Sequence, residues 1–172
     1  MSDEPAEIVW QGKYLTVRKQ GTWEYVGRAR GIRAAVIVAV DEGHVLLVEQ
    51  YRVPIGRRCL ELPAGLVGDE AAGEAAEIAA IRELEEETGY RAEKMVDLGR
   101  YYSSPGMVSE SFTLLRAEGL EKVGEGGGVP GEDIEAHRVP LRDLAAFVAA
   151  KRADGVAIDV KLLMMLAADL LD

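Results

Sequence analysis

The chain has 172 residues, of which 48% are hydrophobic and 29% are charged, a composition that indicates one folded domain and excludes a disordered or fibrous protein. Its 30 acidic and 20 basic side chains give a formal net charge of -10, which disfavours binding to nucleic acid or to an anionic membrane. The single cysteine, Cys59, excludes an intrachain disulfide, and no apolar run has the length of a signal peptide or a membrane span, so we expect a cytoplasmic protein.

Short β-prone runs dominate the first part of the chain. Three of them predict a small antiparallel sheet, at residues 8–10, 14–18 and 22–26. The two most apolar runs, residues 34–40 and 45–50, are joined by Asp41-Glu42-Gly43 and should form a central hairpin. A weaker strand at residues 59–62 precedes Pro63, and a loop rich in glycine then runs to Gly73.

Residues 74–88 form the clearest predicted helix. The segment is rich in Ala, Glu, Leu and Arg, contains no Gly or Pro, and is followed by Gly89 at the usual stop position. Its apolar residues Ile78, Ile81 and Leu84 recur at intervals of three, so we expect all three to face the core.

The remainder of the chain alternates between strands and helices. Strands are expected at residues 96–102, 111–117 and 134–139, and helices at residues 141–151 and 159–171. A loop with many glycines, residues 119–131, separates the last two strands. Mixed strands around one central helix, followed by a helical tail, predict a single α/β domain over residues 1–172, built as an α/β sandwich.

Three carboxylates of the predicted central helix fall on one side of it. Glu83 and Glu87 are four residues apart, and Glu86 is three residues from Glu83. Like charges at this spacing repel each other, and hard cations such as Mg²⁺ or Mn²⁺, which prefer carboxylate oxygen, would relieve the repulsion. A solvated acidic helix face is the alternative, and from the helix alone it is the more common explanation.

The spacing around these carboxylates resembles the signature of the Nudix hydrolases. The matching residues are Gly68, Glu74, Arg82-Glu83-Leu84, Glu86-Glu87 and Gly89-Tyr90. Two flanking segments resemble the ADP-ribose pyrophosphatase branch of that family: Leu60-Glu61-Leu62-Pro63-Ala64-Gly65, and Ser103-Ser104-Pro105-Gly106, whose proline lies sixteen residues after Gly89. The resemblance implies a Nudix fold, which is an α/β/α sandwich with a mixed central sheet, and divalent-metal-dependent cleavage of a diphosphate.

Carried over position by position, the resemblance implies a set of metal ligands. Glu83 and Glu87 would bind the metal together with the backbone carbonyl of Ala64, and Glu86 would be a third ligand or would orient the attacking water. A late acidic residue commonly completes such sites, and Glu132 is the first candidate for ligand or base. Asp133 and Glu135 are weaker options, and an exposed loop acid is the alternative. Supporting roles fall to Gly65, Glu74, Arg82 and Gly89.

The chain departs from the family pattern at two places. Some relatives carry an additional catalytic glutamate two positions before the late ligand, where this chain has Pro130. The segment between Ala64-Gly65 and Glu74 is also a few residues longer than in close ADP-ribose hydrolases. Gly65 is therefore a better candidate than Gly68 for the structural glycine of the signature.

Two further segments, Thr22-Trp23-Glu24 and Gln50-Tyr51-Arg52, resemble segments of the same branch that hold the nucleotide base and the diphosphate. Trp23 offers a flat surface for a base, and Arg28 and Arg52 could bind phosphate oxygens, although a core tryptophan and surface arginines are the alternatives. The resemblance also implies a homodimer in which the amino-terminal strands, within residues 1–30, contribute to the nucleotide site.

The expected activity is Mg²⁺-dependent hydrolysis of ADP-ribose, or of a related nucleoside diphosphate sugar, to a nucleoside monophosphate and a sugar phosphate, with Mn²⁺ as a possible substitute. GDP-mannose or a dinucleotide would need only a different base and sugar pocket. A nucleotide-binding sensor without turnover is an alternative of another class, which the intact carboxylate cluster disfavours. No nucleic acid or membrane partner is expected.

Overall fold

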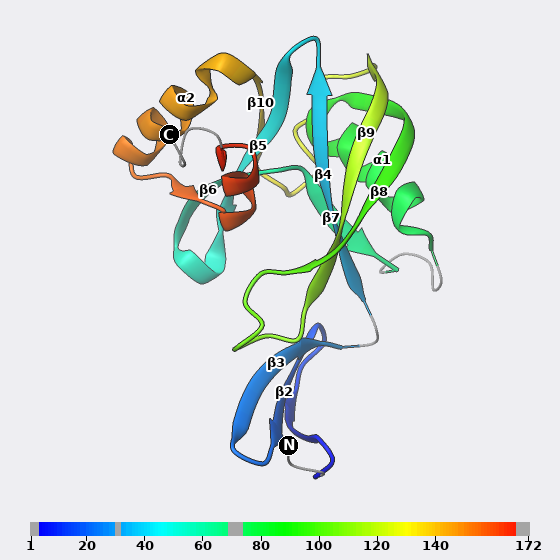
Figure 1. Cartoon of the computed structure of the whole chain (residues 1–172), viewed down its shortest axis with the longest axis vertical. Helices are drawn as coiled ribbons and strands as arrows, with labels where there is room; N and C mark the ends of the chain where they lie inside the picture. Colours follow the sequence, from blue (N-terminus) through cyan, green and yellow to red (C-terminus); the bar gives the residue numbers. More distant parts are fainter. Residues whose placement is uncertain (1–3, 30–31, 69–73, 168–172) are drawn as a thin grey trace.

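A computed structural model describes residues 4–29, 32–68 and 74–167 of the chain. The smaller of its two sheets has three antiparallel strands in the expected place: β1 (Glu7–Gln11), β2 (Leu15–Gln20) and β3 (Trp23–Arg28). This sheet projects from one end of the molecule (Figure 1). Because three strands cannot cover both of their own faces, several large apolar side chains are exposed on it: Ile8, Val9, Trp10, Tyr14, Leu15 and Trp23.

The larger sheet has eight strands in the order β11-β6-β5-β4-β9-β8, with β10 paired to β5 and β7 paired to β4. Its strands are β4 (Arg33–Asp41), β5 (His44–Arg52), β6 (Arg57–Glu61), β7 (Ala64–Val67), β8 (Tyr90–Tyr102), β9 (Ser111–Lys122), β10 (Ile134–Pro140) and β11 (Ala157–Ile158). Two pairs, β4 with β9 and β6 with β11, are parallel, and the remaining described pairs are antiparallel. The sheet is therefore mixed.

Helices lie on both sides of this sheet (Figure 1). Helix α1 (Ala76–Thr88) covers one face, and α2 (Leu144–Ala153) with the short helix η3 (Val160–Met164) lies on the other; η1 (Val53–Ile55) and η2 (Leu141–Asp143) are single turns. Ile37 of β4 and Leu115 of β9 pack in the core under α1, whereas Val36 and Leu114, their neighbours in sequence, pack in the core under α2. Burial on both faces explains the continuous apolar run in β4. The α/β sandwich predicted from the sequence is confirmed.

Three strand predictions differ from the structure. Strand β7 was expected to be loop, β8 begins at Tyr90 rather than at residue 96, and β9 continues to Lys122 into the expected glycine loop. Local sequence favours none of these extensions, since β7 contains Gly65 and the start of β8 is rich in helix-forming residues. Pairing of β7 with β4 and of β8 with β9 supplies the backbone hydrogen bonds instead.

The helix predictions need two corrections. Ile78 is 63% exposed, so its assignment to the core was wrong, whereas Leu84 is fully buried and Ile81 is partly buried. The buried stripe of α1 runs through Ala80 and Leu84, because small alanines let the helix approach the sheet closely. In the last predicted helix, residues 160–164 form a tight 3-10 turn, and residues 168–171 lie outside the described residues. No helix in the described part of the chain combines the length and apolar character needed to cross a membrane.

Candidate active site

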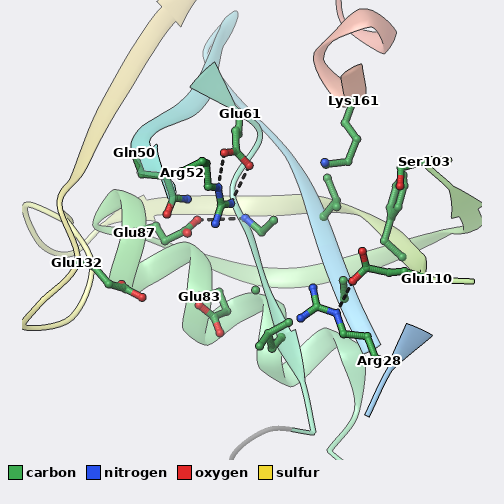
Figure 2. A pocket seen from close by; sticks show the side chains of 16 residues that line it. Arg28, Gln50, Arg52, Glu61, Glu83, Glu87, Ser103, Glu110, Glu132 and Lys161 are labelled. Atoms are coloured by element: carbon green, nitrogen blue, oxygen red, sulfur yellow. Dashed lines mark hydrogen bonds and ion pairs between the residues drawn. The ribbon is translucent and has the colours of Figure 1, made fainter. Parts of the chain in front are cut away.

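An open cavity of about 390 Å³ lies where α1, β4–β7 and the loop before β10 meet. Figure 2 shows carboxylates grouped toward one side of it, Glu83 and Glu87 from α1 and Glu132 from the loop before β10. Three basic side chains also line the cavity: Arg52 lies near Glu87, and Arg28 and Lys161 lie toward the opposite side. Residues from distant parts of the sequence thus form one charged pocket.

Glu87 is the most buried of these carboxylates, with 4% of its surface exposed. Its Oε2 accepts a hydrogen bond from the backbone amide of Ala64 at 3.1 Å. Burial raises the pKa of Glu87 to about 8, and the charges of Glu83 and Glu132 add to this effect against the opposing Ala64 hydrogen bond and Arg52 charge. A buried carboxylate with two like charges nearby favours either a proton or a bound cation.

Glu83 lies against β7 at Gly65. A β-carbon built on Gly65 would overlap the side chain of Glu83, so only glycine leaves room for this carboxylate between the helix and the strand. Gly68 follows β7 with a left-handed φ of 84°, and its amide lies 3.5 Å from Oε2 of Glu74. The two glycines therefore occupy different environments, and Gly65 is the one in contact with the carboxylate cluster.

Arg82 links two carboxylates of α1, Glu83 and Glu86. The guanidinium of Arg82 contacts Oε1 of Glu83 at 3.1 Å and Oε2 of Glu86 at 3.2 Å. Glu86 is not among the side chains that line the cavity, and it borders a shallow apolar depression with Ile78 and Ile81 instead. One guanidinium thus contacts Glu83 and Glu86 together, and the expected role of Glu86, as a third metal ligand or as the group that orients the attacking water, stays a prediction.

Two of the cavity's basic side chains were expected and one was not. Arg52 binds Glu61 through two hydrogen bonds of 2.6 and 2.8 Å, and Arg28 contacts Glu110 at 2.5 Å. Lys161, at the start of η3, is held by Asp159 at 2.6 Å. Sequence reasoning missed Lys161 because it lies in a predicted helix with no motif. It also missed the ion pair between Glu61 and Arg52, although Glu61 belongs to the family-like segment Leu60–Gly65.

Trp23 does not line the cavity of its own chain. It begins β3 in the projecting sheet and is 62% exposed. The core-tryptophan alternative is therefore excluded, and its predicted stacking on a base remains a prediction.

A second acidic cluster lies under α2, where Glu49, Glu135 and His137 bring three potential metal ligands within 4.8 Å of one another. Glu49, however, already contacts Arg58 at 2.7 Å and Lys151 at 2.6 Å. Burial would raise the pKa of Glu49, and the hydrogen bonds and charges of these two residues outweigh it, so the pKa is lowered. Two cationic side chains thus neutralise the cluster, which is an ion-pair network rather than a good metal site.

Two weaker candidates for the late acidic residue belong to this network. Asp133 contacts Arg58 at 2.7 Å, and Glu135 lies 3.7 Å from His137. Neither of them lines the cavity, whereas Glu132 does.

A mixed α/β sandwich that holds a carboxylate cluster beside paired arginines defines a site suited to a polyanion bound together with hard cations. The chain belongs to the NUDIX domain family, whose model matches residues 29–160. The relatives and a solved structure agree with this assignment.

An ADP-ribose pyrophosphatase of Bacillus subtilis (strain 168) is 36% identical over 118 residues, which cover 68% of this chain and 62% of that protein. An uncharacterized Nudix hydrolase of Schizosaccharomyces pombe is 34% identical over 169 residues, covering 91% of this chain and 80% of its own length. A crystal structure of an ADP compounds hydrolase superposes with a TM-score of 0.68 at 24% identity, covering 96% of this chain and 91% of that chain, and shares the fold.

Proposed function

We propose that the protein hydrolyses the diphosphate bond of ADP-ribose, or of a related nucleoside diphosphate sugar, and releases a nucleoside monophosphate and a sugar phosphate. The proposal rests on one observation: Glu83, Glu87, Glu132 and Arg52 line the same cavity. The matched Bacillus relative is named an ADP-ribose pyrophosphatase, which supports this substrate class.

The carboxylate side of the cavity fits a divalent cation. Glu87 is nearly fully buried, and the charges of Glu83 and Glu132 raise its pKa further, so the ionised cluster lacks enough compensating positive charge of its own. Glu83, Glu87 and Glu132, with the carbonyl of Ala64, would hold Mg²⁺, or Mn²⁺ in its place, through the hard oxygen ligands that these ions prefer. When bound, the ion supplies charge neutralisation for the diphosphate and acidifies a water molecule.

The remaining steps belong to side chains of the chain itself. Arg52 is oriented by its two hydrogen bonds to Glu61, so its remaining donors can bind a phosphate oxygen. Glu132 lines the cavity, so we assign to it the proton of the attacking water, with Glu86 as the second candidate for orienting this water. As the water oxygen bonds to phosphorus, the bond from phosphorus to the bridging oxygen breaks and the leaving phosphate carries the electron pair.

Four structural residues support the site in this proposal. Gly65 makes room for Glu83, Arg82 braces Glu83 and Glu86, and Gly89 ends α1 with a φ of 73°. Glu74 precedes α1 and contacts the amide of Gly68.

We further propose a cytoplasmic homodimer in which the projecting sheet contributes to the nucleotide site. The exposed Trp10 and Trp23 on this sheet are the side chains that such an interface would cover. Trp23 would then stack on the base in a site shared between two subunits. The net charge of -10 supports the absence of a nucleic acid or anionic membrane partner.

Product analysis on a substrate panel tests the proposal. ADP-ribose, GDP-mannose, dinucleotides and nucleoside triphosphates would each be incubated with Mg²⁺, with Mn²⁺ and with a chelator. We expect metal-dependent conversion of ADP-ribose, or of another nucleoside diphosphate sugar, into two monophosphates. If the protein binds nucleotide but hydrolyses none of these compounds, the proposed enzymatic function is wrong and a nucleotide-binding sensor is favoured.

A further inference from the structure

A glycine-rich segment, residues 124–128, is hydrogen-bonded to the carboxyl-terminal end of α1. The amides of Gly127 and Gly128 donate hydrogen bonds to the carbonyl oxygens of Glu87 and Glu86, each at 2.9 Å. The amide of Gly124 donates to the carbonyl of Gly89 at 3.0 Å. These bonds satisfy carbonyls that the end of a helix leaves without an internal partner, and they join the segment to the turn that carries Glu87.

Close backbone packing accompanies these hydrogen bonds. A β-carbon on Gly126 would lie 2.5 Å from the carbonyl carbon of Thr88 and 2.6 Å from the carbonyl oxygen of Glu87. The φ of Gly126 is +72°, in the left-handed region that favours glycine. Any larger residue here would push the segment off the helix.

The same segment contacts the carboxylate of Glu132. A β-carbon on Gly128 would lie 2.6 Å from Oε2 of Glu132, so the missing side chain leaves space for this carboxylate. The same Oε2 accepts a hydrogen bond from the amide of Val129 at 3.1 Å, and the amide of Glu132 donates to the carbonyl of Val129 at 3.0 Å. Glu132 is thus hydrogen-bonded to the segment, and the segment is hydrogen-bonded to the helix that carries Glu83 and Glu87.

We propose that residues 124–132 form a fixed bracket that positions Glu132 beside Glu83 and Glu87, with Gly126 and Gly128 as the positioning residues. The bracket holds the late carboxylate at the cation site before substrate arrives, and it does not act as a lid. This inference rests on the proposed function of Glu132, but the presence of the bracket can be tested separately.

Two glycine substitutions test the bracket, and each has a control matched in backbone conformation. Gly128→Ala places a methyl group against Glu132, and Gly155→Ala is its control, because Gly155 has a φ of +84° against +82° and nothing within 4 Å of its β-carbon position. Gly126→Ala pushes the segment off α1, and Gly43→Ala is its control, with a φ of +73° and the same open surroundings. Each control carries the strain of alanine at positive φ without the contact.

Binding of Mn²⁺, followed through the paramagnetic resonance signal of the free ion, is the first readout. We expect Gly128→Ala and Gly126→Ala to raise the Mn²⁺ dissociation constant by about 10- to 100-fold, the range typical of residues that orient metal ligands. The two controls should bind Mn²⁺ like the parent protein. In a Glu132→Gln background, Gly128→Ala should cause little further loss, and a full additional loss there would overturn the role of Gly128.

Amide hydrogen exchange of Gly127 and Gly128, resolved by nuclear magnetic resonance, is the second readout and needs neither metal nor substrate. A bracket predicts slow exchange in the free protein, comparable to that of β9, and faster exchange in Gly126→Ala. Fast exchange in the free parent protein that slows only when substrate is added would show a lid and overturn the inference. Slow exchange without any hydrolysis would leave the bracket standing and overturn the proposed function.

Discussion

The backbone amide of Ala64 donates a hydrogen bond to the buried carboxylate of Glu87, with 3.1 Å between the nitrogen and Oε2. The bond joins β7 to the last turn of α1 and fixes Glu87 at the edge of the cavity. A glutamine at this position keeps an oxygen that can accept the bond but carries no charge. Substitution of Glu87 by Gln therefore separates the role of the charge from that of the fold.

Glu87→Gln is expected to abolish most turnover while leaving the fold intact. The change removes the negative charge of a metal ligand, and glutamine has a helix propensity similar to that of glutamate. Turnover would be measured at increasing Mg²⁺, with circular dichroism as the check on folding. Full activity at saturating Mg²⁺ would remove Glu87 from the ligand set. Glu85→Gln, on the same helix but paired with Arg91 at the surface, is the control and should keep its activity.

The contribution of Glu87 to the stability of the metal-free protein should fall as the pH rises from about 5 to about 8. Burial raises the pKa of Glu87 from its ordinary 4.5 to about 8, so between these values the folded state binds more protons than the unfolded state. The free energy of unfolding then decreases with rising pH, by up to about 1.4 kcal/mol per pH unit from this group. Urea unfolding in chelator should show a stability gain for Glu87→Gln that is small at pH 5 and larger at pH 8. An equal difference at both pH values would contradict the raised pKa.

Arg52→Gln is expected to destabilise the protein and to raise the Michaelis constant. The change leaves the carboxylate of Glu61, whose side chain is only 5% exposed, without its guanidinium partner. Because Arg52 itself is partly exposed, we expect a loss of about 1–3 kcal/mol in the free energy of unfolding. Adding Glu61→Gln should recover part of that stability but not the Michaelis constant. Arg116→Gln, which breaks an exposed pair with Glu118, should cost less than about 0.5 kcal/mol.

Trp23→Ala should raise the Michaelis constant for a nucleoside diphosphate sugar by roughly tenfold and lower the turnover number much less, because base stacking contributes about 1–3 kcal/mol to binding. Steady-state kinetics and sedimentation would be measured on the same samples, since Trp23 lies outside the cavity of its own chain. Trp10→Ala, which removes an exposed tryptophan of the same proposed interface, measures the effect of the interface without the base contact. An unchanged Michaelis constant for Trp23→Ala would limit this residue to subunit contacts.

Lys161→Met should raise the Michaelis constant by roughly tenfold, since hydrogen bonds to charged groups contribute about 1.5–3 kcal/mol. Lys161 lines the cavity, and Asp159 holds its ammonium group in place. The proposed substrate, a nucleoside diphosphate sugar, carries two phosphoryl charges, so removal of this cation should weaken its binding. Lys94→Met, at an exposed position of β8, is the control. Equal Michaelis constants for the two variants would show that Lys161 does not contact the substrate.

The central helix and the site residues that it carries could be predicted from the sequence because they depend on short spacings. Helical periodicity places Glu83 and Glu87 near each other, and Gly89 ends the helix in a left-handed conformation. Apolar runs likewise predicted β4 and β5. Helical periodicity also groups Glu86 with Glu83 and Glu87. Arg82 contacts both Glu83 and Glu86, and the role of Glu86 in the site stays a prediction.

Other features of the fold and the site could be seen only in the tertiary structure, because they depend on contacts between residues far apart in the chain. Strand β7 exists because β4 pairs with it, and Lys161 reaches the cavity because η3 packs beside Phe112 of β9. The glycines before Glu132 indicated only a loop, since a φ preference says nothing about the surface on which the loop packs. The sequence by itself determined the chemistry of the helix, through local spacing, whereas long-range packing determined which distant charges surround it.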